Sequence, residues 1–208
     1  MKKHNRSKKS RQKRKISNMA LIILCILGIV LLGDIIGAIM YLRQSEAMQA
    51  GLMQYIATGN SLSFLQIFWR QFLYQLTIWT MGITIVGNLV NLFLVFVRGV
   101  SAGFNLAVLV QEIGTDHPGT IVLWLIQYIL ILFTTILGVY FSLRFAYLVI
   151  KSLIKKKYEL IKTHLKLYAM QFVLIIVLTL ITSMLSAVTT ASIQNRLIES
   201  ATVVEVEV

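Results

Sequence analysis

The chain has little of what shapes soluble or disulfide-bonded domains. Among its 208 residues there is one proline, one cysteine and only 13% charged residues, whereas soluble domains carry roughly 25%. A lone Cys25 can form neither an intrachain disulfide nor a thiolate metal cluster. Hydrophobic residues make up 57% of the chain. This composition excludes an ordinary soluble domain and predicts a chain that lies mostly within a lipid bilayer.

Acidic residues are scarce as well, with 8 Asp and Glu against 20 Lys and Arg. The basic residues gather in two segments: residues 1–18 hold nine and no acid, and residues 151–166 hold six and one acid, Glu159. Because basic segments that flank membrane spans stay in the cytoplasm, we expect both there. The first is predicted to be a disordered tail that could also touch anionic lipids. No folded polar module accompanies it, so nucleic-acid binding is not expected.

Four long apolar runs can each contain at least one spanning helix of about 20 residues: residues 19–42, 72–113, 121–150 and 168–191. The first exceeds the apolar core of a signal peptide and is predicted to be an uncleaved anchor. Only if the second run contains two spans, 72–89 and 92–113, do both basic segments lie on the same side. A tight cytoplasmic turn is then expected near Gly87–Asn91. The sequence therefore predicts an all-α integral membrane protein, a five-span helix bundle with a cytoplasmic N-terminus.

Two segments are predicted outside the cell. Residues 43–71 form a loop whose apolar side chains recur at helical spacing from Leu62 to Phe72, which predicts an amphipathic helix that enters the second span. Residues 192–208 form an acidic extracellular tail. Tryptophans such as Trp79 are expected in an aromatic belt on this outer side.

Motifs that carry catalysis are missing. The sequence has no HExxH, no GxSxG and no Walker A lysine loop. His4, His117 and His164 fall on both sides of the predicted membrane, so they cannot hold one zinc ion. Glu112 and Asp116 lie in a short polar turn, where a solvated pair is the ordinary interpretation and acid–base work the alternative. We therefore expect no enzymatic activity, no metal and no cofactor.

Four polar residues interrupt the apolar runs: Asp34, Arg98, Gln127 and Arg144. Arg98 is expected about two turns beyond the inner turn, where its side chain can extend to the cytoplasmic interface, and Arg144 at a similar depth. The alternative is that both form a ring that binds an anion or a partner. Asp34 lies near mid-membrane, too far from this layer for an easy pair with Arg98, and should face protein or water, charged or protonated. Gln127 either lines a cavity or joins helices.

Small residues that allow close helix packing in lipid are frequent. They comprise Gly33 and Gly37, Gly99 and Gly103, the additional positions Gly82 and Gly87, and a hydroxyl stripe of Thr179, Thr182, Ser183, Ser186 and Thr190. Spacings of three and four place the stripe on one helix face. Packing within the chain is the main interpretation, and a stripe that lines a substrate path is the alternative.

Between Gly37 and Lys151 the chain resembles the stage II sporulation protein M family. Phe96-Val97-Arg98-Gly99 and Gly103-Phe104 match the family's F-x-K-G and the G-F that follows, with Arg for Lys, whereas Gly87-Asn88-Leu89 lacks the proline of its G-x-P. Leu125-Ile126-Gln127-Tyr128 keeps two residues of its L-P-Q-N stretch. The resemblance implies five spans with a cytoplasmic N-terminus.

Two functions follow from this resemblance. Family members in spore formers act in a membrane complex with peptidoglycan-cutting partners during engulfment, which implies a non-enzymatic scaffold, or assembly subunit, in envelope remodelling. Relatives also occur beside ATP-binding-cassette genes, which implies a membrane subunit that partners an ABC ATPase in bacteriocin export or self-immunity. We favour the scaffold, in the bacterial cell membrane as a multi-pass protein.

Overall fold

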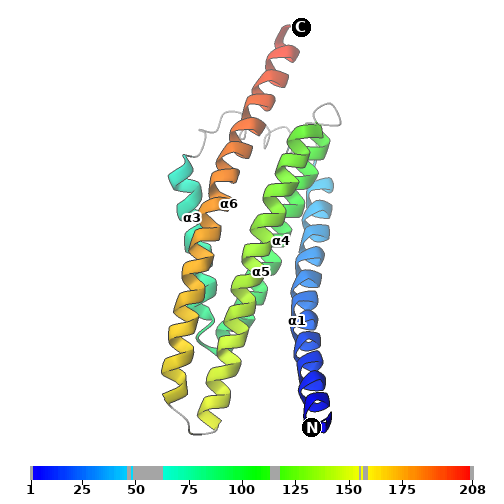
Figure 1. Cartoon of the computed structure of the whole chain (residues 1–208). Helices are drawn as coiled ribbons and strands as arrows, with labels where there is room; N and C mark the ends of the chain where they lie inside the picture. The colour runs from blue at the N-terminus through cyan, green and yellow to red at the C-terminus, as the bar shows by residue number, and fades with distance from the viewer. Residues whose placement is uncertain are drawn as a thin grey trace.

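The structure is a computed structural model that describes residues 2–45, 48, 63–112, 118–154, 156 and 159–206, with side chains described only within residues 20–193. These residues form five α-helices and no strand (Figure 1). The helices are α1 (Lys2–Leu42), α3 (Phe64–Met81), α4 (Ile85–Glu112), α5 (Pro118–Ile154) and α6 (Glu159–Val206). The prediction of an all-α protein is confirmed for the described part of the chain.

Successive helices run in opposite directions along a common axis. In Figure 1, α1, α4 and α6 point one way, and α3 and α5 point the other. The N-terminus, the α3–α4 turn and the α5–α6 junction therefore lie at one end of the bundle. Both lysine- and arginine-rich segments belong to this end, which we call the basic end.

Four of the helices are long and apolar enough to cross a membrane. The candidate spans are Ala20–Leu42, Val86–Gln111, Pro118–Ile154 and Ile161–Ile193. The remaining helix, α3, has 18 residues and includes Gln66, Arg70, Gln71 and Gln75, and it falls outside this set. The chain thus has the helices of a membrane protein. The helix α3, which is more polar than the others, packs among them.

The turn between α3 and α4 corrects the predicted one. It lies at Gly82–Thr84, not at Gly87–Asn91, so α4 begins several residues earlier than the predicted third span. The backbone N–H of Gly82 closes α3 on the carbonyl of Ile78, and the Thr84 hydroxyl accepts a hydrogen bond from the Gly87 N–H at 2.9 Å. Thr84 therefore caps the start of α4, and Gly87 is a helical residue.

Both ends of the chain are more helical than predicted. The first helix, α1, begins at Lys2, so the segment predicted to be a disordered tail forms part of it. At the other end, α6 continues through most of the predicted tail to Val206. Neither segment contains the glycine or proline that would end a helix there. The predicted outer amphipathic helix is present only as the first turns of α3, and residues 49–62 of that loop lie outside the described residues.

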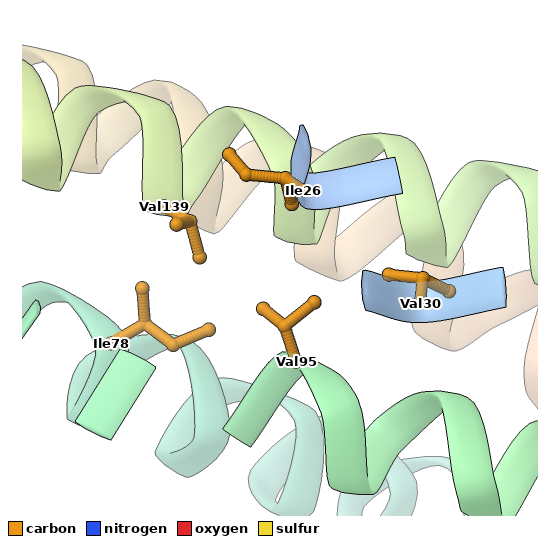
Figure 2. Packing of buried hydrophobic residues seen from close by; sticks show 5 residues of the cluster. All are labelled: Ile26, Val30, Ile78, Val95 and Val139. Atoms are coloured by element: carbon orange, nitrogen blue, oxygen red, sulfur yellow. The ribbon is translucent and has the colours of Figure 1, made fainter. Parts of the chain in front are cut away.

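The hydrophobic core is small and lies between four helices. Figure 2 shows its buried residues, which come from α1, α3, α4 and α5: Ile26, Val30, Ile78, Val95 and Val139. Many large apolar side chains point outward instead, among them Leu24 and Val86, which are 69% and 71% exposed. In a bilayer this exposure has little cost, because lipid tails are as apolar as the side chains.

Candidate functional site

Arg98 lies in the middle of α4. It is 13 residues after Ile85, about 20 Å along the helix axis, so it lies farther from the turn before α4 than the predicted two turns. Its guanidinium carbon sits 4.4 Å from the centre of the Tyr74 ring on α3, a cation–π contact. No acid among the described residues forms an ion pair with it. The depth differs because the turn that starts α4 lies farther back in the sequence.

Asp34 is held by a tyrosine rather than by Arg98. The Tyr128 hydroxyl on α5 lies 2.8 Å from each carboxylate oxygen of Asp34 on α1. The ring of Trp124 stacks on Tyr128 with their centres 5.3 Å apart. As expected, Asp34 faces protein, and the disfavoured pair with Arg98 is not formed. Together, Asp34, Tyr74, Arg98 and Tyr128 link four helices, and we call them the Arg98 cluster.

A cavity of about 250 Å³ opens beside this cluster, between α4 and α5. Its walls are Arg98, Ser101, Ala102, Asn105, Trp124, Gln127, Tyr128 and Ile131. Ser101 and Asn105 are exposed and lie one and two turns from Arg98 toward Glu112, so they mark its edge. Arg98 also borders a water-sized space of about 10 Å³ on the side of Val30. The cation therefore has open room on two sides.

Gln127 both lines the cavity and joins two helices. Its Nε2 donates to the Ser186 hydroxyl of α6 at 2.8 Å, while its carbonyl oxygen Oε1 is buried without a donor. The two interpretations that the sequence left open are therefore combined in one residue.

The hydroxyl stripe of α6 faces glutamine side chains. The hydroxyls of Thr182 and Ser183 donate to Oε1 of Gln71 on α3, each at 3.0 Å, and Nε2 of Gln71 donates to Ser186 at 3.0 Å. Thr179 is buried and bonds the backbone of its own helix. The buried end of the stripe is Thr189, whereas the predicted Thr190 is only partly buried. These hydroxyls hold α3 against α6.

A further polar cluster near the α3–α4 turn was not predicted. Asn91 is fully buried and donates to the carbonyl of Ile78 and to the Ser142 hydroxyl, both at 2.9 Å. Ser142 in turn donates to Oδ1 of Asn88 at 2.8 Å. The signal was two asparagines three residues apart in an apolar helix, which places both on one face.

The predicted packing glycines lie at close approaches between helices. Gly33 and Gly37 of α1 lie against Gly99, Val100 and Phe104 of α4, and Gly103 lies against the backbone of Asp34. A methyl group on any of these four glycines would overlap backbone atoms of the other helix. Gly82 lies against the side chains of Ser142 and Tyr168, and Gly87 against the backbone of Met81 at the end of α3 and the side chain of Thr84.

Two other predicted positions are corrected. Arg144 is exposed on α5, 16 residues after Tyr128, which is about 24 Å along the helix; it shares no layer with Arg98, and no ring of two arginines exists. Trp79 lies near the basic end rather than in an outer belt. It stacks on Tyr168 and Phe172 with ring centres 5.2 and 4.7 Å apart.

No group of three or more His, Cys, Asp or Glu that could hold a metal ion occurs within the described ranges. The sequence model of the stage II sporulation protein M family matches residues 18–192, a segment that includes the cavity and the Arg98 cluster. No curated protein and no solved structure matches the chain.

Proposed function

The chain belongs to the stage II sporulation protein M family, and we propose on this premise that it is a non-enzymatic assembly subunit of a bacterial cell-envelope complex. It is a membrane protein of that family, with four helices able to cross a bilayer. The proposed partners are proteins that remodel the envelope, such as peptidoglycan hydrolases or their membrane anchors.

The observation that carries the proposal is how the interior polar groups are used. Hydrogen bonds join the helices to one another through the side chains of Gln71, Asn91 and Gln127. Backbone contacts at Gly37 and Gly103 bring α1 close to α4. Such contacts favour fixed helix positions, which suits a subunit that presents surfaces to partners.

We further propose that all five helices cross the membrane and that the N-terminus is cytoplasmic. The alternating helix directions in Figure 1 support this arrangement. It places both basic segments on one side, in agreement with the retention of positive charge in the cytoplasm. The polar residues of α3 do not oppose a crossing, because Gln71 and Gln75 bond α6 and α5 rather than facing lipid.

A second candidate is a membrane subunit that works with a separate ABC ATPase in peptide export or self-immunity. The length of α5 favours it: 37 residues span about 55 Å, against about 30 Å for the hydrocarbon core. The end of α5 and the start of α6 would then project into the cytoplasm, where Lys151, Lys156 and Lys162 are exposed. Such a basic projection could contact a cytoplasmic protein.

The test is purification of the tagged protein from its native host in mild detergent, with mass spectrometry of what comes with it. The proposal predicts a wall hydrolase or its anchor in stoichiometric amount. An ATPase instead would replace the first candidate by the second, and no stoichiometric partner would contradict both. Gly103→Leu should lose the partner, while Gly28→Leu, where an added Cβ meets no atom within 4 Å, should retain it.

A further inference from the structure

The Arg98 guanidinium lies in the middle of the bundle without a counter-charge among the described side chains. The face of Tyr74 covers it on one side, and the only acid of the cluster, Asp34, has both oxygens within hydrogen-bond distance of the Tyr128 hydroxyl. A charge in the membrane interior is costly unless it is paired or hydrated. A cation–π contact supplies only part of that compensation, so Arg98 is suited to receive an anion.

The space for that anion is the 250 Å³ cavity between α4 and α5. Pockets for drug-sized ligands measure roughly 300–1,000 Å³, so this one takes a compact polar group. Arginine binds phosphate through parallel N–H donors, and the Asn105 amide adds a donor at the edge. Ala102 and Ile131 form apolar walls.

The position of the opening indicates where the ligand comes from. Ser101 and Asn105 are exposed at the cavity's edge, on the outer face of α4. In a membrane bundle such a face meets lipid. A group that enters there is therefore most readily attached to a hydrocarbon chain, which would remain outside among the lipid tails.

We infer that the cavity between α4 and α5 binds the phosphate of an anionic membrane lipid, with Arg98 as its cationic partner. Arg98, Ser101 and Asn105 supply hydrogen-bonding groups over the last two turns of the headgroup's path from the interface. This inference does not depend on the scaffold function.

The experiment is a titration of the full-length protein, purified in neutral detergent, with phosphatidylglycerol and, separately, with phosphatidylcholine of the same acyl chains. Binding is followed by the thermal unfolding midpoint. Phosphatidylglycerol should bind at least about tenfold more tightly, because phosphatidylcholine carries the same phosphate together with a quaternary ammonium that the Arg98 guanidinium repels. Arg98→Gln should abolish this preference. Arg144→Gln, a matched change of an exposed arginine that does not line this cavity, should leave it unchanged.

If Arg98→Gln does not fold, Asn105→Leu tests the same site, because it changes only an exposed side chain at the cavity's edge and should weaken phosphatidylglycerol binding several-fold. Equal binding of the two lipids by the wild-type protein would overturn the inference. The counter-charge of Arg98 would then have to be an acidic residue of a partner. Unchanged binding by both variants would overturn it too. Inorganic phosphate is the third probe: if it stabilises the protein as well as the lipid does and displaces it, the site takes a free anion rather than a lipid.

Discussion

At the scale of single residues, the Arg98 cluster joins side chains from four helices through a cation–π contact and a hydrogen bond to a carboxylate. Asp34, Arg98 and Gln127 are conspicuous in apolar runs, and all three line or adjoin one site. Their partners, Tyr74 and Tyr128, carry no signal in the sequence, because a tyrosine in a span is usually read as an interface anchor. The expected depth of Arg98 depends on where the preceding turn lies. Because the predicted turn lay later in the sequence than the observed one, Arg98 was expected too close to the cytoplasm.

The hydrogen bond between Tyr128 and Asp34 gives the first prediction. Asp34→Asn keeps a carbonyl oxygen for the Tyr128 hydroxyl, so the free energy of unfolding should change little. Asp34→Leu leaves that hydroxyl without its acceptor and should cost about 1–3 kcal/mol. Unfolding in detergent, followed by circular dichroism, measures both variants. If Asp34→Asn is as damaging as Asp34→Leu, the charge of the carboxylate and not its hydrogen bond is what the fold needs.

At the scale of helices, the long apolar runs could be predicted directly from the sequence. The ends of the helices and the bounds of α3, which mixes polar and apolar residues, could not. The turn at Gly82–Thr84 was missed because a glycine and two asparagines farther on gave a stronger turn signal than the Thr84 cap. Polar residues of α3 were read as the wet face of a surface helix. In the structure Gln71 and Gln75 face α6 and α5, a use of polar groups that periodicity alone does not reveal.

The contact between α1 and α4 gives the second prediction. In Gly37→Ala the new methyl group would overlap the carbonyl of Val100, so α1 must move away, at a cost of about 1–3 kcal/mol. Gly28→Ala on the same helix meets no atom within 4 Å and should be neutral or stabilising by up to about 1 kcal/mol. Unfolding midpoints of the two purified variants decide this. Equal effects would show that α1 does not pack through the Gly37 face.

The third prediction concerns how α3 is held. Gln71→Leu removes its hydrogen bonds to Thr182, Ser183 and Ser186 and should destabilise the protein. In a double-mutant cycle with Ser183→Ala, the two changes should be coupled by about 0.5–3 kcal/mol. Thr80→Val is the control partner, because the exposed Thr80 hydroxyl bonds only the backbone of α3. If the effects of Gln71→Leu and Ser183→Ala on the free energy of unfolding add as fully as those of Gln71→Leu and Thr80→Val, the assigned role of Gln71 is wrong.

At the scale of the whole molecule, charge distribution and helix direction agree. The sequence placed two basic segments on one side, and Figure 1 shows their helices meeting at one end of the bundle. That agreement did not require the correct turn, since any turn between two spans in residues 72–113 preserves the alternation. The cavity between α4 and α5 could not be foreseen, because it depends on how far apart two helices lie. In the topology that we propose, α3 crosses the membrane and the basic end is cytoplasmic.

The most direct test is labelling of single cysteines in intact cells with a maleimide that does not cross membranes, in a Cys25→Ser background. The positions are Ser63 before α3, Ile83 in the α3–α4 turn and Lys156 in the α5–α6 junction, all three exposed. We predict that Ser63→Cys reacts from outside, and that Ile83→Cys and Lys156→Cys react only after the cells are opened. If Ser63→Cys and Ile83→Cys react from the same side, α3 does not cross the membrane, and the proposed five-span topology is wrong.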